Sequence, residues 1–153
     1  MSRPELQIRP AAASDLSAIV ALLADDALGQ SREDESASEA YRAAFAAIER
    51  DPNNTVYVLE RDGEILGCAQ LTIIPGLARR GVTRGQIEGV RIASPYRGER
   101  LGRLFFENLI ALARDKGCGL VQLTSDKARS DAHRFYEDIG FSATHEGFKM
   151  ALR

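Results

Sequence analysis

The chain has 153 residues, of which 44% are apolar and 27% charged, and its formal net charge is −2. This length and composition are typical of a single globular domain, residues 1–153, that buries its core without disulfides or metal. The slightly acidic balance gives no global attraction to nucleic acid or to an anionic membrane, so we expect neither as a partner and any anion site must be local.

The cysteines and the N-terminal residues indicate the cellular compartment of the protein. Cys68 and Cys118 lie far apart and form no C-x-x-C motif, which argues against a disulfide framework or a zinc site. The N-terminal residues lack an apolar signal core, and no apolar run approaches the roughly 20 residues of a membrane helix. We expect a cytoplasmic protein without a metal site.

The first third of the chain reads as a strand followed by two helices. Alternating residues predict a strand over 6–9, and apolar spacing predicts helices that begin near Ser14 and Ser38. The acidic segment 25–39 lies between them. It is either a solvated loop or a rim that attracts a cationic substrate.

The middle of the chain reads as three strands. Composition predicts a strand over 55–59, and the Asp62-Gly63 pair predicts a hairpin turn into a returning strand over 65–74. An arginine-rich loop, 76–85, leads to the next strand, 86–93.

The last third alternates between the two kinds of element. We expect a helix from Leu101 that ends at Gly117, a strand over 120–124, and a short helix over 132–139. Two closing strands are expected, one from Phe141 onward and one over 148–152. The strand–helix–strand crossover over 86–124 predicts that its two strands are parallel.

A glycine-containing turn joins the strand 86–93 to the long helix. Free N–H groups at a helix N-terminus bind anions, and Arg97, Arg100 and Arg103 add positive charge there. These arginines oppose the helix dipole, so a bound anion explains them better than the alternative, ordinary solvated side chains. We expect a pyrophosphate cradle made of Arg97, Gly98, Glu99, Arg100, Leu101, Gly102 and Arg103. The turn lacks the P-loop spacing, which makes a nucleotide-dependent transferase the least favoured function.

Two motifs together resemble the GNAT superfamily of acetyl-CoA-dependent N-acetyltransferases. They are R-G-x-R-L-G after a V-x-I strand, and A-x-x-F-Y-E-x-x-G-F over 132–141. The resemblance implies an α/β (α+β mixed) fold with a mostly antiparallel sheet, splayed between two parallel central strands and flanked by about four helices. The longer run 126–136 is similar to a bacterial branch that includes aminoalkylphosphonate N-acetyltransferases.

The resemblance also implies how acetyl-CoA, the co-substrate, is held. The stretch Val90-Arg91-Ile92 receives the pantetheine arm, and residues 97–103 hold the pyrophosphate. Arg100 stands where the family usually has Gly; we expect it to keep right-handed geometry and to pair with phosphate, or instead to crowd the site. Arg129 stands where many members have an Asn that contacts the pantetheine, and we keep it among the cofactor-binding residues.

Tyr136 is the expected acid, because the resemblance implies that this Tyr donates a proton to the departing CoA thiolate. A phenol with a reference pKa of about 10 is protonated at pH 7. In the alternative, Phe135 and Tyr136 are only the apolar face of a short helix. We assign Phe135 to the core and Tyr136 to the site.

Glu88 is the expected base, acting on the substrate ammonium through water. Alternation places it with Val90 and Ile92 on an apolar face, where an unpaired carboxylate costs free energy unless its pKa is raised. The alternative has equal weight: Gly89 introduces a bulge that turns Glu88 outward, or an arginine pairs with it.

We therefore expect an N-acetyltransferase in which the primary amine of a small molecule attacks acetyl-CoA directly, without a cysteine nucleophile. The amine would enter from the side formed by 25–39 and 76–85. A phosphonate amine would suit both the acidic residues and the arginines of the loop, but the acceptor is not identified. The alternatives are an acyl-CoA-binding sensor without transfer, or acetylation of a protein N-terminus or lysine. A homodimer is left open.

Overall fold

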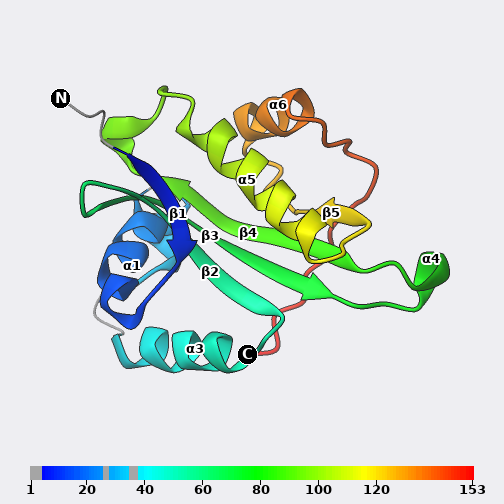
Figure 1. The fold of residues 1–153 in the computed structure, drawn as a ribbon, viewed down its shortest axis with the longest axis horizontal. Helices are drawn as coiled ribbons and strands as arrows, with labels where there is room; N and C mark the ends of the chain where they lie inside the picture. The colour runs from blue at the N-terminus through cyan, green and yellow to red at the C-terminus, as the bar shows by residue number, and fades with distance from the viewer. Residues whose placement is uncertain (1–4, 26–27, 35–37) are drawn as a thin grey trace.

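The computed structural model describes residues 5–25, 28–34 and 38–153. Within them, five strands form one sheet in the order β1-β2-β3-β4-β5 (Figure 1). Neighbouring strands are antiparallel except for the parallel pair β4 and β5, which confirms the expected crossover. The strands are β1 Leu6–Pro10, β2 Asn54–Arg61, β3 Glu64–Ile74, β4 Arg84–Ile92 and β5 Leu120–Gln122.

Helices α1 and α3 lie on one side of this sheet, and α5, the longest helix, lies on the other. The helices are α1 Leu16–Ala24, α2 Gly29–Arg32, α3 Ser38–Arg50, α4 Ala78–Gly81, α5 Leu101–Asp115 and α6 Ser130–Asp138. Figure 1 shows α5 across one face, with α6 beyond it and α1 and α3 on the opposite side. None of the helices in the described ranges is both long and apolar enough to cross a bilayer.

The first helix begins later than Ser14. The chain forms a 3-10 turn over Ala13–Asp15, and the Asp15 carboxylate accepts a hydrogen bond of 2.7 Å from the Ala12 N–H. Asp15, and not Ser14, therefore organises the start of the helix.

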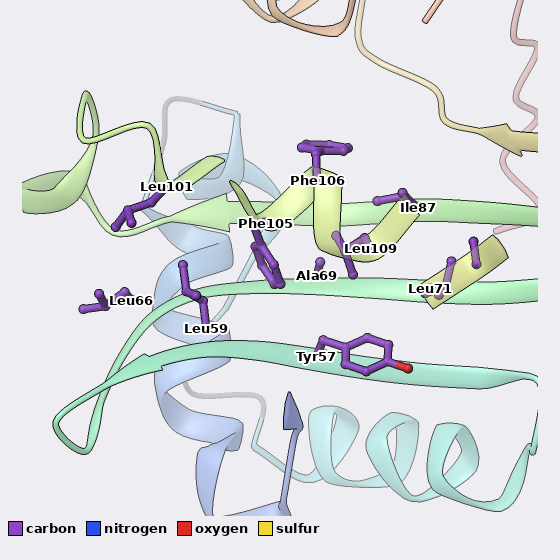
Figure 2. Packing of buried hydrophobic residues seen from close by; sticks show 11 residues of the cluster. Tyr57, Leu59, Leu66, Ala69, Leu71, Ile87, Leu101, Phe105, Phe106 and Leu109 are labelled. Carbon is purple, nitrogen blue, oxygen red and sulfur yellow. The ribbon is translucent and has the colours of Figure 1, made fainter. Parts of the chain in front are cut away.

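The core lies between α5 and the sheet. Phe105 and Leu109 are fully buried against Leu71 and Ile87 of the central strands. Figure 2 shows Phe105 pointing toward β3, whereas Phe106 points away from the sheet. Each such side chain contributes about 1.5–3 kcal/mol through burial, so α5 is held firmly over β3 and β4.

The opposite face of the sheet packs against α1. Ile19 and Leu22 cover Val58 and Cys68 there. Burial raises the pKa of the Cys68 thiol to about 12, against a smaller lowering effect of Arg91. The thiol is therefore protonated at neutral pH and unsuited to nucleophilic attack.

The C-terminal segment does not form the two expected strands. Residues 141–153 are all described and contain no strand. Phe148, Met150 and Leu152 are 92%, 84% and 91% exposed. Their alternation is typical of a strand, but no described strand pairs with them, and a strand forms only when its backbone groups find a partner.

Candidate functional site

The site is built where β4 and β5 separate. The two strands pair only between Arg84–Gln86 and Leu120–Gln122. β4 then continues to Ile92, without a β5 partner among the described residues. Beyond Gln86, the backbone N–H and C=O groups on this edge of β4 therefore do not pair with β5.

A bulge in β4 decides which way its side chains point. Cys68 lies opposite Arg91 and Gln70 lies opposite Glu88, so β4 holds one extra residue at this position. Gly89 supplies the backbone that the bulge needs, with φ of +62°. The bulge reverses the alternation, because two residues of one strand here oppose one of the other.

Glu88 is accordingly exposed, on the face of its partner Gln70, while Val90 and Ile92 pack against the core beneath α5. The expectation that Glu88 shares an apolar face with Val90 and Ile92 is wrong. The alternative, a Gly89 bulge that turns Glu88 outward, is confirmed.

A row of polar side chains continues from Glu88 along the same face. Its β4 members, Arg84, Gln86 and Glu88, lie opposite Ile74, Thr72 and Gln70 of β3. The Gln122 side chain donates a 3.0 Å hydrogen bond to Gln86, and Gln70 donates one of 2.9 Å to Asn54.

Sequence reasoning missed this row. Its signal was present in the alternation of polar residues at 84, 86 and 88 and at 70 and 72.

The N-terminus of α5 is shaped by a left-handed residue. Arg100, the N-cap, has φ of 60° and ψ of 18°, and its side chain makes no capping hydrogen bond. The expectation that Arg100 keeps right-handed geometry is wrong, because the turn needs a positive φ where the family usually places Gly. The first-turn N–H groups thus receive no bond from the N-cap side chain.

Among the described residues, Arg97 and Arg103 of the cradle have partners within the protein. Arg97 donates hydrogen bonds to the carbonyl oxygens of Ile92, at 3.1 Å, and Asp25, at 2.9 Å. Arg103 pairs with Glu107 at 2.9 Å, one turn along α5. Arg100 is exposed. Groups of the protein itself therefore offset part of the positive charge at this turn, which the sequence alone does not predict.

The turn is also tied to the β2–β3 hairpin. Glu99 lies 3.6 Å from Arg61, and the Tyr96 hydroxyl donates a 2.8 Å hydrogen bond to Glu64. The Arg61 guanidinium lies 5.2 Å from the centre of the Tyr96 ring. These contacts fix the approach of the chain to α5.

Tyr136 reaches this region from α6. Its ring packs edge-on against Phe106, with centroids 5.5 Å apart. Burial raises the pKa of the Tyr136 hydroxyl, while the positive charges of Arg129 and Arg91 lower it by less. The phenol is thus protonated at neutral pH and lies within the field of two guanidinium groups.

α6 is held against the start of α5. A Cβ built on Gly102 would lie 3.6 Å from the Phe135 ring and 3.9 Å from Ile92. The structure therefore brings together three of the predicted parts: the end of β4, the first turn of α5, and the Phe135–Tyr136 pair. Arg91 belongs to the same region and donates a 2.9 Å hydrogen bond to the Val90 carbonyl.

The acidic segment contributes to a cavity beside α1. The cavity has a volume of about 810 Å³ and is lined by Ala18, Ala21, Leu22, Ala24, Asp25, Gln30, Glu33, Asp34 and Ile65. Some of its carboxylates already serve the fold: Ser94 donates a 2.6 Å hydrogen bond to Asp25, and Tyr41 donates one of 2.8 Å to Glu33.

For the described residues, the expected entry side for the amine, formed jointly by 25–39 and 76–85, is wrong; residues 26–27 and 35–37 lie outside the described part of the chain. Asp25 contacts Ser94, which follows the end of β4, whereas the loop 76–85 leads into its beginning. A nine-residue strand separates the two ends by roughly 27 Å, and Figure 1 shows α4 at the opposite end of the sheet from α1.

Cys118 and His133 are the other side chains of the types that act as nucleophiles or metal ligands. Burial raises the pKa of the Cys118 thiol, against a smaller lowering effect of Lys116. His133 Nε2 lies 3.1 Å from the Asp126 carbonyl oxygen. In the described part of the chain, no three metal-ligating side chains gather.

Comparison with known proteins identifies the family of the chain. The profile of the acetyltransferase (GNAT) family matches residues 18–141. The aminoalkylphosphonate N-acetyltransferase of Salmonella typhimurium is 30% identical over 149 residues, which cover 97% of this chain and 93% of that protein. The glucosamine 6-phosphate N-acetyltransferase of Trypanosoma brucei brucei is 32% identical over 150 residues, with 97% of each covered.

A solved structure is similar over its whole length. The crystal structure of a transcriptional regulator from Bacillus halodurans C-125 is 43% identical and has a TM-score of 0.92. The match covers 97% of this chain and 100% of that one.

Proposed function

Because the chain belongs to the acetyltransferase (GNAT) family and is an acyltransferase, we propose that it moves the acetyl group of acetyl-CoA to the primary amine of a small molecule. The observation that carries this proposal is the N-terminus of α5, without a side-chain cap, beside the Phe135–Tyr136 pair and the part of β4 that β5 does not cover. Such an arrangement can bind a diphosphate and place a thioester next to a proton donor.

In this proposal residues 97–103 hold the diphosphate and Val90–Ile92 receive the pantetheine arm. The structure fits such a ligand, because the first-turn N–H groups of α5 receive no bond from the Arg100 side chain and the β4 edge is not used by β5. Bound CoA would supply an activated acetyl group and a thiolate leaving group. Arg129, which acts on Tyr136 electrostatically, would face the same ligand.

Tyr136 is the proposed acid. The amine nitrogen forms a bond to the acetyl carbon, the C–S bond breaks, and the Tyr136 hydroxyl gives its proton to the departing sulfur. Its raised pKa keeps the proton in place at neutral pH, and a thiolate with a pKa of about 8.5 is basic enough to take it only when well placed. The pKa values of both cysteines are raised, which supports direct attack.

Glu88 is the proposed base. It is exposed on the α1 face of β4, so water can connect it to a substrate ammonium. Glu88 receives the first proton of the ammonium and passes it to solvent. The nitrogen loses its second proton as the amide forms, and that proton restores the Tyr136 hydroxyl, so the products are the acetamide, CoA thiol and one released proton.

The proposed acceptor is an amine that also carries a phosphoryl or phosphonyl group. The names of both curated relatives describe activity on such compounds. In this chain the polar row of β4 has a carboxylate at Glu88 and a guanidinium at Arg84, four residues or about 13 Å apart along the strand. The amine would lie at Glu88 and the anion toward Arg84, whose side chain can reach back along the row.

The test is CoA release from acetyl-CoA over a panel of matched amines with and without a phosphoryl or phosphonyl group. We expect turnover with the anionic amines, and for Arg84→Met a roughly 10- to 100-fold lower kcat/KM for them alone, the loss expected of one or two charged hydrogen bonds.

Arg80→Met is the matched control, because Arg80 is exposed in α4, away from the row, and it should leave both kinds of amine unaffected. Turnover without preference for the anion would contradict the acceptor class. Tight CoA binding without release for any amine, peptide amines included, would contradict transfer and favour a sensor.

A further inference from the structure

An ion pair joins two segments that lie far apart in the sequence. The Arg32 guanidinium, at the end of α2, donates a 3.0 Å hydrogen bond to the Asp126 carboxylate, in the loop between β5 and α6. The Ala128 N–H and Arg32 lower the pKa of Asp126, against the effect of desolvation, so the carboxylate is ionised at neutral pH. The two side chains are 53% and 37% exposed. A pair so open to water contributes little to stability, so its position is the more informative property.

Asp126 organises the approach of the chain to α6. Its carboxylate accepts a 2.9 Å hydrogen bond from the Ala128 N–H, and its carbonyl oxygen accepts one of 3.0 Å from the Arg129 N–H. His133 Nε2, one turn before Tyr136, lies 3.1 Å from the same carbonyl oxygen. A group that binds Asp126 is therefore linked to the helix that carries Tyr136.

Arg32 belongs to the segment that follows α1 on the other side of the sheet. α1 lies against the bulge of β4, where a Cβ built on Gly89 would be 3.7 Å from Leu23. Asp25, directly after α1, accepts a 2.6 Å hydrogen bond from Ser94, which follows the end of β4. The segment is thus fixed to β4 near Asp25, and through Arg32 it contacts the loop beyond β5.

Glu88 lies between these two contacts. It precedes the bulge at Gly89 and is exposed on the α1 face of β4. Gln122, the last residue of β5, contacts the polar row on the same face, and Asp126 follows four residues later. The Arg32–Asp126 pair therefore connects the two sides of the place where β4 and β5 separate, beside the proposed base.

We propose that Arg32 and Asp126 are positioning residues for the acceptor, whose pairing keeps a bound amine between Glu88 and the thioester. The inference rests on the proposed function. In water the pair is weak enough to part while an acceptor enters or leaves, and it strengthens when a bound acceptor excludes water from around it. CoA would be held by other residues, 97–103 and Val90–Ile92, so its affinity should not depend on the pair.

The first test is a double-mutant cycle with Arg32→Gln, Asp126→Asn and their combination, followed by CoA release with the preferred amine. Asp126→Asn removes the charge and keeps an oxygen for the Ala128 N–H. Each single change should lower kcat/KM for the amine about 5- to 20-fold, mainly through KM, and the combination should lower it no further. The CoA dissociation constant should stay within about twofold. Additive losses, or equally weakened CoA binding, would overturn the proposal.

Lys127 and Glu146 provide the matched control, because they form a 3.3 Å pair at the next residue of the same loop and are 86% and 68% exposed. Lys127→Gln and Glu146→Gln should leave kcat/KM unchanged. Arg32→Lys keeps the charge and should retain most of the activity. The ratio of kcat/KM between the natural protein and Arg32→Gln should shrink as salt is raised. A control pair that matters as much, or a ratio that ignores salt, would contradict the assignment.

Hydrogen exchange tests the pair without turnover. The backbone amides of residues 29–34 should exchange faster in Arg32→Gln and in Asp126→Asn than in the natural protein, and at the natural rate in Glu146→Gln. Unchanged exchange in the first two variants would overturn the proposal. A natural protein that releases no CoA with any amine would contradict the proposed function, and the exchange rates would still decide whether the pair holds the segment.

Discussion

The two edges of the sheet differ in how firmly they are held. At β1, all five residues pair with β2, and Arg9 binds both Asp15 and Glu60 at 2.7 Å. At β5, only three residues pair with β4 and the far edge is free among the described strands. The proposed chemistry lies at the weakly held edge.

The difference suggests that the β1 edge serves stability and the β5 edge serves catalysis. Asp15 is only 8% exposed, and its hydrogen bonds to Arg9 and to the Ala12 N–H join β1 to the start of α1. β5 ends early, which leaves the edge of β4 open to a ligand near Tyr136. Changes at β1 should therefore lower stability and leave the rate intact, and changes near β5 should do the reverse.

The largest effect is expected from Tyr136→Phe. It removes the proposed proton donor and keeps the ring that packs against Phe106, so kcat should fall roughly 100- to 10,000-fold. The CoA dissociation constant and the melting temperature should hardly change. Steady-state kinetics with calorimetric titration of CoA measures this, and unchanged turnover would remove Tyr136 from the mechanism.

Asp15→Asn is expected to act at the other edge. It removes a carboxylate that is hydrogen-bonded to Arg9, so the free energy of unfolding should fall by about 1–3 kcal/mol while kcat is unchanged. Glu107→Gln is the control: its pair with Arg103 is half exposed, and its loss should cost less than about 0.5 kcal/mol. Urea unfolding measures both losses of unfolding free energy. Equal losses would contradict the claim that Asp15 stabilises the fold more than the exposed pair does.

The stabilisation by the Asp15 carboxylate should decrease as the pH falls. The hydrogen bond from Arg9 holds the pKa of Asp15 below its usual value, against the effect of burial. The stabilisation is therefore fully present above the unfolded pKa of about 3.9 and is lost as pH falls through the folded value. The difference in unfolding free energy between the natural protein and Asp15→Asn should shrink below about pH 4, and a difference that persists at lower pH would contradict this.

A smaller loss of stability is expected from Gly89→Ala. The space is open, with Leu23 at 3.7 Å, so the cost comes from the positive φ and should be about 1–2 kcal/mol. Gly63→Ala is the control, because Gly63 has a similar φ of +79° in the β2–β3 turn. Both should lower the melting temperature, but only Gly89→Ala should also lower kcat, because it disturbs the bulge that orients Glu88. Equal activity would contradict that role.

Local signals predicted most of the fold. Asp62 and Gly63 both adopt positive φ in the predicted turn, and the apolar spacing from Leu101 gave the helix that covers the core. The parallel pair followed from the crossover between strands 86–93 and 120–124. These features depend on residues close in sequence, which is why a sequence can show them.

The failures have non-local causes. One extra residue at Gly89 reversed the direction of Glu88, and a pattern of alternation cannot show that a bulge is present. Arg100 took a left-handed conformation because the turn required it, although its side chain does not favour it. Residues 148–152 have a strand pattern, but pattern alone does not supply a neighbouring strand. The roles assigned to Tyr136, Glu88 and the cradle residues stay predictions.

The most direct measurement compares the binding of CoA with that of pantetheine, which lacks the diphosphate. If the first turn of α5 holds the diphosphate, calorimetric titration should show CoA binding at least ~100-fold more tightly, the value expected of one or two charged hydrogen bonds. The preference should weaken as salt is raised. Equal affinities, or a preference that ignores salt, would contradict a diphosphate site at residues 97–103.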